Sequence, residues 1–169
     1  GYPQPVLWLT NSLQVELDDL HRHGGDRGIL FTRSSTNRLC RVFSKGSRGN
    51  GFELDPSSGQ NYFVRCAALN FMRTGIHMVK SSDPFLPANT NFWNNGVLAS
   101  VPATFGGQAV STGALIGVQF GRLYLSNSVF VANGPAHAVF TVNAGAIHGD
   151  YNCYHQTYPE SSFADIPAI

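Results

Sequence analysis

The chain has 169 residues, enough for one domain with a hydrophobic core. Lys and Arg number 11 against 10 Asp and Glu, and this near balance gives no reason to expect nucleic acid or an anionic membrane as partner. No apolar run approaches the roughly 18 residues of a membrane span, and the N-terminus has no signal-peptide pattern. Frequent glycine, 18 residues, is typical of short strands and tight turns.

A short phrase recurs along the chain: an apolar residue, a variable residue and a second apolar residue, usually after Gly. It reads PVLWLTNS from residue 5, then GILFTRSS, GFELDPSS and GIHMVKSS from residues 28, 51 and 75. Further copies, GVLASVPA, GVQFGRLY and HAVFTVNA, begin at residues 96, 117 and 137. The steps are therefore 23, 23, 24, 21, 21 and 20 residues. A period in the low twenties indicates a stacked, repeating architecture.

Period-2 alternation places the second and fourth positions of each phrase on the inner face of a short strand. The second positions are Val6, Ile29, Phe52, Ile76, Val97, Val118 and Ala138. The fourth positions are Trp8, Phe31, Leu54, Met78, Ala99, Phe120 and Phe140. Segments between the phrases, such as LQVELDDL and RLYLSNSVFV, predict further strands. One aligned strand per repeat predicts an all-β parallel β-helix over residues 1–155.

An antiparallel sandwich of short strands is the alternative fold, although it does not predict matching inward columns at a fixed period. Leucine-rich repeats have a similar period, but their LxxLxLxxN pattern is absent. Residues 156–169 have no period, and we expect this tail to cap or dock on the last rung. The three cysteines, Cys40, Cys66 and Cys153, form no CxxC pair and are predicted to be buried free thiols.

The segments GNGFELDPSSGQNYFVRC, RTGIHMVKSS and LYLSNSVFVANG resemble coils of the pectate-lyase-like superfamily, which includes pectin-degrading enzymes and bacteriophage tailspikes. The resemblance covers about residues 5 to 155 and implies a right-handed parallel β-helix of about seven coils, with a period of 20–24 residues. It does not extend to an activity, because no Asn-Thr-Asp or Gly-His-Gly active-site segment is present. No catalytic residue is therefore carried over from the superfamily.

Several predicted outward positions are apolar and need cover from a partner chain or from the chain's own loops. They are Leu7, Leu9, Leu30, Val79, Leu98 and Val139. The resemblance to tailspikes implies a homotrimer on the virion surface or outside the cell, in contact with other virion proteins and with surface polysaccharide. We also expect the chain to be part of a longer protein. The alternative functions are a polysaccharide-degrading hydrolase or lyase and a purely structural capsid-decoration or spike-shaft module. No cofactor is expected.

The candidate catalytic residues lie in the third phrase and in the phrase that follows it. Glu53 and Asp55 share one face of a strand about 7 Å apart, and His77 is predicted to lie directly above Glu53. Two such carboxylates could act as acid and base in glycoside cleavage, and the histidine could tune the proton transfer. The predicted glycan-binding residues are Arg33, Lys80 and Gln119. The alternative is that Glu53 pairs with His77 or Arg33 as an ordinary outward polar residue.

Two other polar segments have plainer interpretations. His148, Asp150 and His155 match no dedicated metal-site spacing and are interpreted as the edge of the last coil, so no metal site is predicted. The segment HRHGGDRG, residues 21–28, is interpreted as a solvated turn that could line a glycan groove.

Overall fold

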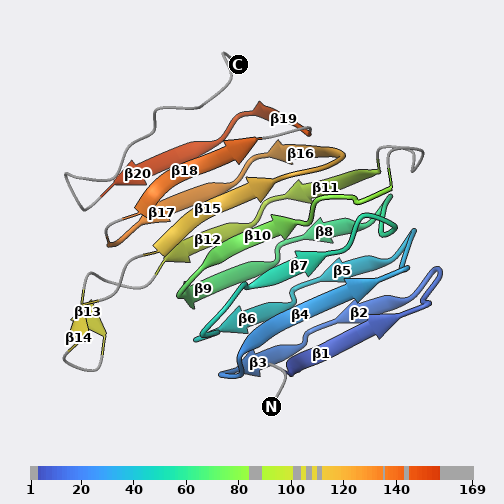
Figure 1. Ribbon diagram of the computed structural model, residues 1–169, viewed down its shortest axis with the longest axis horizontal. Coiled ribbons are helices and arrows are strands. Elements are labelled where there is room, and N and C mark those ends of the chain that lie inside the picture. Colours follow the sequence, from blue (N-terminus) through green and yellow to red (C-terminus); the bar gives the residue numbers. More distant parts are fainter. Residues whose placement is uncertain are drawn as a thin grey trace.

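The computed structural model describes residues 4–83, 89–100, 104–105, 108–109, 112–134, 136–142 and 145–156. All regular secondary structure in these residues is β-strand, and they contain no helix that could cross a membrane. The strands stack from the N-terminal to the C-terminal end in three parallel sheets (Figure 1). One passage of the chain through the three sheets makes one coil.

Each sheet takes one strand from every coil, in chain order. The first sheet contains β1 (Pro5–Thr10), β4 (Arg27–Thr32), β7 (Phe52–Leu54), β10 (Thr74–Met78), β15 (Thr112–Val118) and β18 (Ala136–Val142). The second sheet contains β2 (Glu16–Asp18), β5 (Arg38–Cys40), β8 (Tyr62–Val64), β11 (Thr90–Asn94), β16 (Arg122–Ser126) and β19 (Ala146–Asp150). The third sheet contains β3 (His21–His23), β6 (Phe43–Lys45), β9 (Ala67–Phe71), β12 (Val97–Ser100), β17 (Val129–Ala132) and β20 (Cys153–Gln156).

This architecture is all-β with parallel strands, as predicted, and is compatible with a parallel β-helix. Ile29, Phe52, Ile76 and Ile116 are successive partners in the first sheet, so their side chains form one inward column. The described residues make six coils, not the predicted seven. The predicted tail lies almost entirely outside the described residues, because only residue 156 of it is described.

The predicted register is wrong by one residue in the first strand. Leu7 pairs with Ile29 and Leu9 with Phe31, so Leu7 and Leu9 face the core. Trp8, predicted to point inward, is 54% exposed. Both faces of PVLWLT carry apolar residues, and alternation alone therefore does not identify the inner one.

The predicted repeat also fails after the fourth phrase. Val97 begins β12, which belongs to the third sheet. The next strand of the first sheet is β15, whose Ile116 pairs with Ile76 and whose Val118 pairs with Met78. The extra length of this coil lies in residues 79–89 and 101–111, and the second stretch includes the short antiparallel pair β13 (Thr104–Phe105) and β14 (Gln108–Ala109), which projects from the stack (Figure 1).

The glycines that open the phrases lie where the chain turns from the third sheet into the first. A Cβ atom on Gly28 would collide with the carbonyl oxygen of Gly51. A Cβ atom on Gly51 would lie 2.8 Å from the carbonyl oxygen of Gly75, and one on Gly75 would lie 2.6 Å from that of Leu115. Successive coils approach too closely here for any side chain, which explains the recurring Gly.

The turns between the second and third sheets all have two residues, and the first of the two is left-handed in every described coil. These left-handed residues, with φ between 50° and 54°, are Asp19, Arg41, Arg65, Asn95, Asn127 and Tyr151. Because none of these six left-handed residues is a glycine, each has a side chain that projects from this corner and can bind a neighbour.

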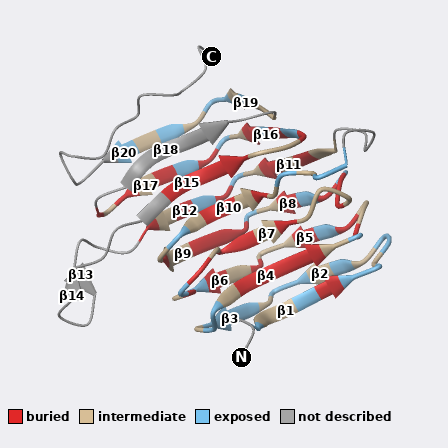
Figure 2. Cartoon of the chain, in the orientation of Figure 1, coloured by how far each residue is buried: buried red, intermediate tan, exposed pale blue. Residues whose placement is uncertain are grey.

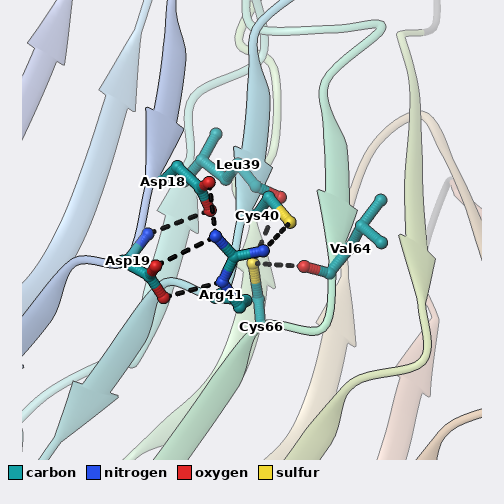
Figure 3. Close-up of polar contacts among 7 residues, drawn as sticks. All are labelled: Asp18, Asp19, Leu39, Cys40, Arg41, Val64 and Cys66. Carbon is teal, nitrogen blue, oxygen red and sulfur yellow. Dashed lines mark hydrogen bonds and ion pairs between the residues drawn. The ribbon is translucent and has the colours of Figure 1, made fainter.

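Arg41 uses this corner to bind the coil below it (Figure 3). Its Nε donates to Asp19 Oδ1 at 2.7 Å and its Nη2 to Asp19 Oδ2 at 2.9 Å, and Nη2 also contacts Asp18. The hydrogen bond from Arg41 lowers the pKa of Asp19, and the same bond raises the pKa of Arg41. Nearby Cys66 directs its thiol inward to the Leu39 carbonyl (Figure 3).

The core combines aromatic rings with a buried amide ladder. Phe63 packs edge-on against Phe31 and Phe52, with ring centroids 5.4 and 5.5 Å apart. Asn37, Asn61 and Asn91 are fully buried on successive coils at the entry to the second sheet. Their amides form a chain, in which Asn37 Nδ2 donates to Asn61 Oδ1 at 3.0 Å and Asn61 Nδ2 donates to Asn91 Oδ1 at 3.1 Å. Figure 2 shows buried residues along the middle coils and more exposed residues toward both ends.

The apolar residues predicted to point outward do not form an outward column. Leu9 and Leu98 belong to the core, and Leu7 packs against it. Leu30 is outward in register with Glu53 but is only 9% exposed. The side chain of Val139 lies outside the described residues.

The three thiols are free, as predicted. Cys66 is buried and Cys40 is partly buried, whereas Cys153 is exposed, so the prediction of buried thiols is wrong for Cys153.

Candidate functional site

A polar cavity of about 380 Å³ lies over the outer face of the first sheet, where the chain arrives from the third sheet. It spans three neighbouring coils. Its lining residues are Asp26, Arg27, Arg48, Gly49, Asn50, Glu53, Arg73, His77 and Val79. Six of these nine residues are charged or carry an imidazole, and Asn50 adds an amide, so the cavity is suited to a polar ligand.

The turns from the third sheet to the first bring the arginines together. These turns have three residues before β4, six before β7 and two before β10. The N–H of Arg48 donates to the Gly25 carbonyl at 3.0 Å, and the N–H of Arg73 donates to the Gly49 carbonyl at 3.2 Å. Arg48 and Arg73 therefore lie on adjacent rungs, about 4.8 Å apart along the stack.

Glu53 lies at the base of the cavity, in the middle of β7. Its side chain is 13% exposed, and its Oε1 lies 3.3 Å from the Arg27 guanidinium. Its Oε2 accepts a hydrogen bond from Asn50 Nδ2 at 2.7 Å. The carboxylate is therefore held from two sides, with lone pairs left on both oxygens for a ligand.

Asn50 links Glu53 to His77 and fixes the tautomer of that histidine. The N–H of Thr74 donates to Asn50 Oδ1 at 3.2 Å, which orients the amide so that Nδ2 faces the cavity. Asn50 Nδ2 lies 3.1 Å from His77 Nδ1. Because an amide NH₂ only donates, His77 Nδ1 is the acceptor and carries no proton. The other side-chain hydrogen bond of His77 is to Gln119.

The environment keeps His77 neutral. Burial lowers the pKa of His77 below its ordinary value, and the positive charge of Arg27 adds to this effect. The charge of Glu53 and the hydrogen bond to Gln119 oppose it. Three guanidinium groups therefore face two carboxylates and a neutral ring in the cavity, which leaves one positive charge in excess.

Arg48 and Arg73 carry that excess. Both side chains are exposed, and neither forms an ion pair with any residue that the structure describes. Arg27, by contrast, is partly buried and paired with Glu53. The cavity thus has one neutralised end and one cationic end, and it can accept hydroxyl groups at the first and an anion at the second.

Two of the predicted catalytic residues lie together. His77 pairs with Glu53 in register on adjacent strands, as the alternation indicated. Asp55 has a different environment, because its carboxylate accepts hydrogen bonds from the Arg33 N–H at 3.2 Å, from the Ser57 hydroxyl at 2.9 Å and from the Ser58 hydroxyl at 2.7 Å. It stabilises its own turn and does not line the cavity.

The predicted glycan-binding residues lie near the other end of the strands. Arg33 and Lys80 follow the C-terminal ends of β4 and β10, and neither lines the cavity. Gln119 reaches the site indirectly through His77, and its Oε1 accepts the Lys80 N–H at 3.2 Å.

Sequence reasoning missed the cavity residues that come from turns: Arg48, Asn50 and Arg73. The segment HRHGGDRG was one available signal, because its Asp26 and Arg27 line the cavity. Its first part is a strand, β3, and not the predicted turn.

A second surface feature is an aromatic ladder on the outer face of the second sheet. Tyr62, Phe92, Tyr124 and His148 are stacked on successive coils, with ring centroids 4.7, 5.5 and 4.6 Å apart. Each inner ring is covered on both faces by its neighbours. The ladder therefore stabilises the sheet and presents ring edges, not faces, to a ligand.

No family model, curated protein or solved structure matches the chain.

Proposed function

We propose that the chain is a right-handed parallel β-helix module that attaches a particle to surface polysaccharide, with the cavity between Arg27, Glu53 and Arg73 as its saccharide site. Right-handedness is supported by the strong preference of strand–crossover–parallel strand connections for that hand. The relation to the pectate-lyase-like superfamily, and to tailspikes within it, belongs to the same proposal.

One observation carries the proposal: the polar groups at the neutralised end of the cavity are already held in place before a ligand enters. Asn50 is held by the Thr74 N–H, and Glu53 is held by Asn50 and Arg27. Saccharides present many hydroxyl groups at set angles, and preorganised polar groups on rigid strands bind them with little loss of conformational freedom.

The virion-surface setting and the homotrimer remain proposals that rest on the resemblance. A trimer interface would need exposed apolar residues, and Val97 and Val129 offer a pair, since they are register neighbours on the third sheet and are 36% and 39% exposed. They are better candidates than the predicted outward leucines, because Leu9 and Leu98 are buried in the core.

A polysaccharide-cleaving enzyme is the second candidate. Glu53 and Asp26 line the same cavity, and they could act as acid and base from neighbouring coils. Asp55 is less suited to that role, since its oxygens already accept hydrogen bonds within a turn.

A glycan array tests the proposal with the whole chain and a Glu53→Gln variant. We expect binding to at least one surface polysaccharide and its loss in Glu53→Gln, while Glu16→Gln, far from the cavity, keeps it. Release of reducing ends by the wild type, abolished in Glu53→Gln, would favour the enzyme instead. Absence of binding and cleavage on a broad array, or binding that ignores Glu53, would overturn the proposal.

A further inference from the structure

We infer that the saccharide bound in this cavity carries a phosphate or sulfate ester, held between Arg48 and Arg73. This inference rests on the proposed function and names the chemical class of its ligand. It follows from the arrangement of the two arginines that the cavity leaves unpaired.

The two arginines place unpaired positive charge in one cavity. Arg48 and Arg73 occupy adjacent rungs and line one cavity, yet neither pairs with a described carboxylate. Like charges on neighbouring strands repel, and the repulsion grows as solvent is displaced. Asp26 lines the same cavity but forms no ion pair with Arg48 or Arg73. An anion between the two guanidinium groups would remove the repulsion.

The shape of the anion also matters. A planar carboxylate matches one guanidinium fork when both lie in one plane. Arg48 and Arg73 come from rungs about 4.8 Å apart, so their side chains approach a ligand from two different levels of the stack. A phosphate or sulfate ester is tetrahedral and directs its three terminal oxygens away from one another in three dimensions, so it can accept hydrogen bonds from both forks at once.

The ester lies at the cationic end of the cavity. The Glu53 carboxylate repels an anion and accepts hydrogen bonds from hydroxyl groups, and it is already paired with Arg27. The ester therefore goes to the Arg48 and Arg73 end, while neighbouring sugar hydroxyls donate to Glu53. The ligand needs both the ester and the sugar hydroxyls. Inorganic phosphate lacks the sugar hydroxyls, and a neutral sugar lacks the ester.

The test is isothermal titration of the whole chain with glucose 6-phosphate, glucose 6-sulfate, glucuronate, glucose and inorganic phosphate. We expect one or both esters to bind at least about tenfold more tightly than glucuronate or inorganic phosphate, the size of effect given by one charge-assisted hydrogen bond. The ester that binds more tightly shows whether the natural ligand carries a phosphate or a sulfate. Arg48→Gln and Arg73→Gln should each weaken ester binding by about tenfold or more, and Arg122→Gln, an exposed arginine on the second sheet, should not.

Several outcomes would overturn the inference. The inference is wrong if glucuronate or inorganic phosphate binds as tightly as the esters. It is also wrong if both arginine variants bind the esters with wild-type affinity while their circular dichroism is unchanged. If these results came with polysaccharide binding on the array, the proposed function would stand without the ester. If no saccharide or polysaccharide bound, both would fall.

Discussion

The buried amide ladder offers the sharpest test of how the coils are held together. The Asn61 side chain makes four hydrogen bonds: two accepted from Asn37, one donated to Asn91 Oδ1 and one donated to the Ser34 carbonyl. Asn61→Leu keeps the side-chain volume close to the original, so little cavity is created, but leucine makes none of these bonds.

The cost can be worked out group by group. Asn37 Nδ2 keeps the Ser12 carbonyl as partner, and Asn91 Oδ1 keeps the Asn61 N–H. The Asn37 N–H and the Ser34 carbonyl lose the bond to Asn61 inside the core. At roughly 2 kcal/mol for each buried group left unsatisfied, Asn61→Leu should lower the free energy of unfolding by about 4 kcal/mol. That is a large part of the ~5–15 kcal/mol typical of a domain.

Urea unfolding followed by far-UV circular dichroism measures this loss. The matched control is Asn94→Leu, the same exchange on the outer face of β11, where the Asn94 side chain makes one weak bond, at 3.4 Å, with Asn127. We expect the control to change the free energy of unfolding by less than about 0.5 kcal/mol. A loss below about 1 kcal/mol for Asn61→Leu would refute the argument that the ladder's hydrogen bonds hold the coils in register.

Four further predictions concern single residues. Asp55→Ala should lower the free energy of unfolding by about 1–2 kcal/mol, through loss of the turn it caps, and should leave the proposed saccharide binding unchanged; loss of that binding would mean that Asp55 belongs to the site. Phe92→Leu removes two stacked ring contacts and should cost about 1–3 kcal/mol in thermal or urea unfolding; no loss would mean that the ladder is incidental. The pKa of His77 is lowered in the folded state, so its contribution to stability is present above the ordinary value of 6.5 and is lost as pH falls below it. The free energy of unfolding lost between pH 7 and pH 5 should therefore be smaller in His77→Gln than in the wild type. The same pH dependence of unfolding in both proteins would contradict a neutral His77. Burial raises the pKa of Cys66 to about 12, so iodoacetamide at pH 8 should modify exposed Cys153 and spare Cys66 until urea is added, whereas rapid labelling of Cys66 would contradict its burial.

The sequence was informative wherever stacking enforces a column. Glycine at the start of the second, third and fourth phrases, followed by apolar residues two apart, reflects a corner with no room for a Cβ atom and a filled core. These requirements repeat on every coil, so the strands β4, β7 and β10 could be aligned from the sequence. The pairing of Glu53 with His77 followed from that alignment.

The same pattern could not identify which sheet a strand belongs to. In all three sheets, inward apolar residues alternate with outward residues. The segment GVLASVPA therefore has the pattern of a first-sheet phrase although its strand lies in the third sheet. The longer connections at 79–89 and 101–111 together lengthen the step from Ile76 to Ile116 to 40 residues, which a fixed period in the low twenties does not predict. Alternation shows which residues of a strand share a face, but it does not show the strand's place in the coil.

The cavity could not be predicted for a related reason, which also explains why it lies where it does. Every described corner between the second and third sheets has two residues and a left-handed first position, so its backbone is the same in each coil. The turns that enter the first sheet have three, six and two residues in the first coils, so their backbone differs from coil to coil. Differences in length let Arg48, Asn50 and Arg73 converge above Glu53, which a regular coil would leave exposed on a flat sheet. The regular corners keep the scaffold rigid and the irregular turns build the site on it, which is the division expected when function is carried by loops on a repeating core. Shortening the turn 46–51 to two residues should therefore abolish the cavity while the first-sheet pairing of β4 with β7 persists.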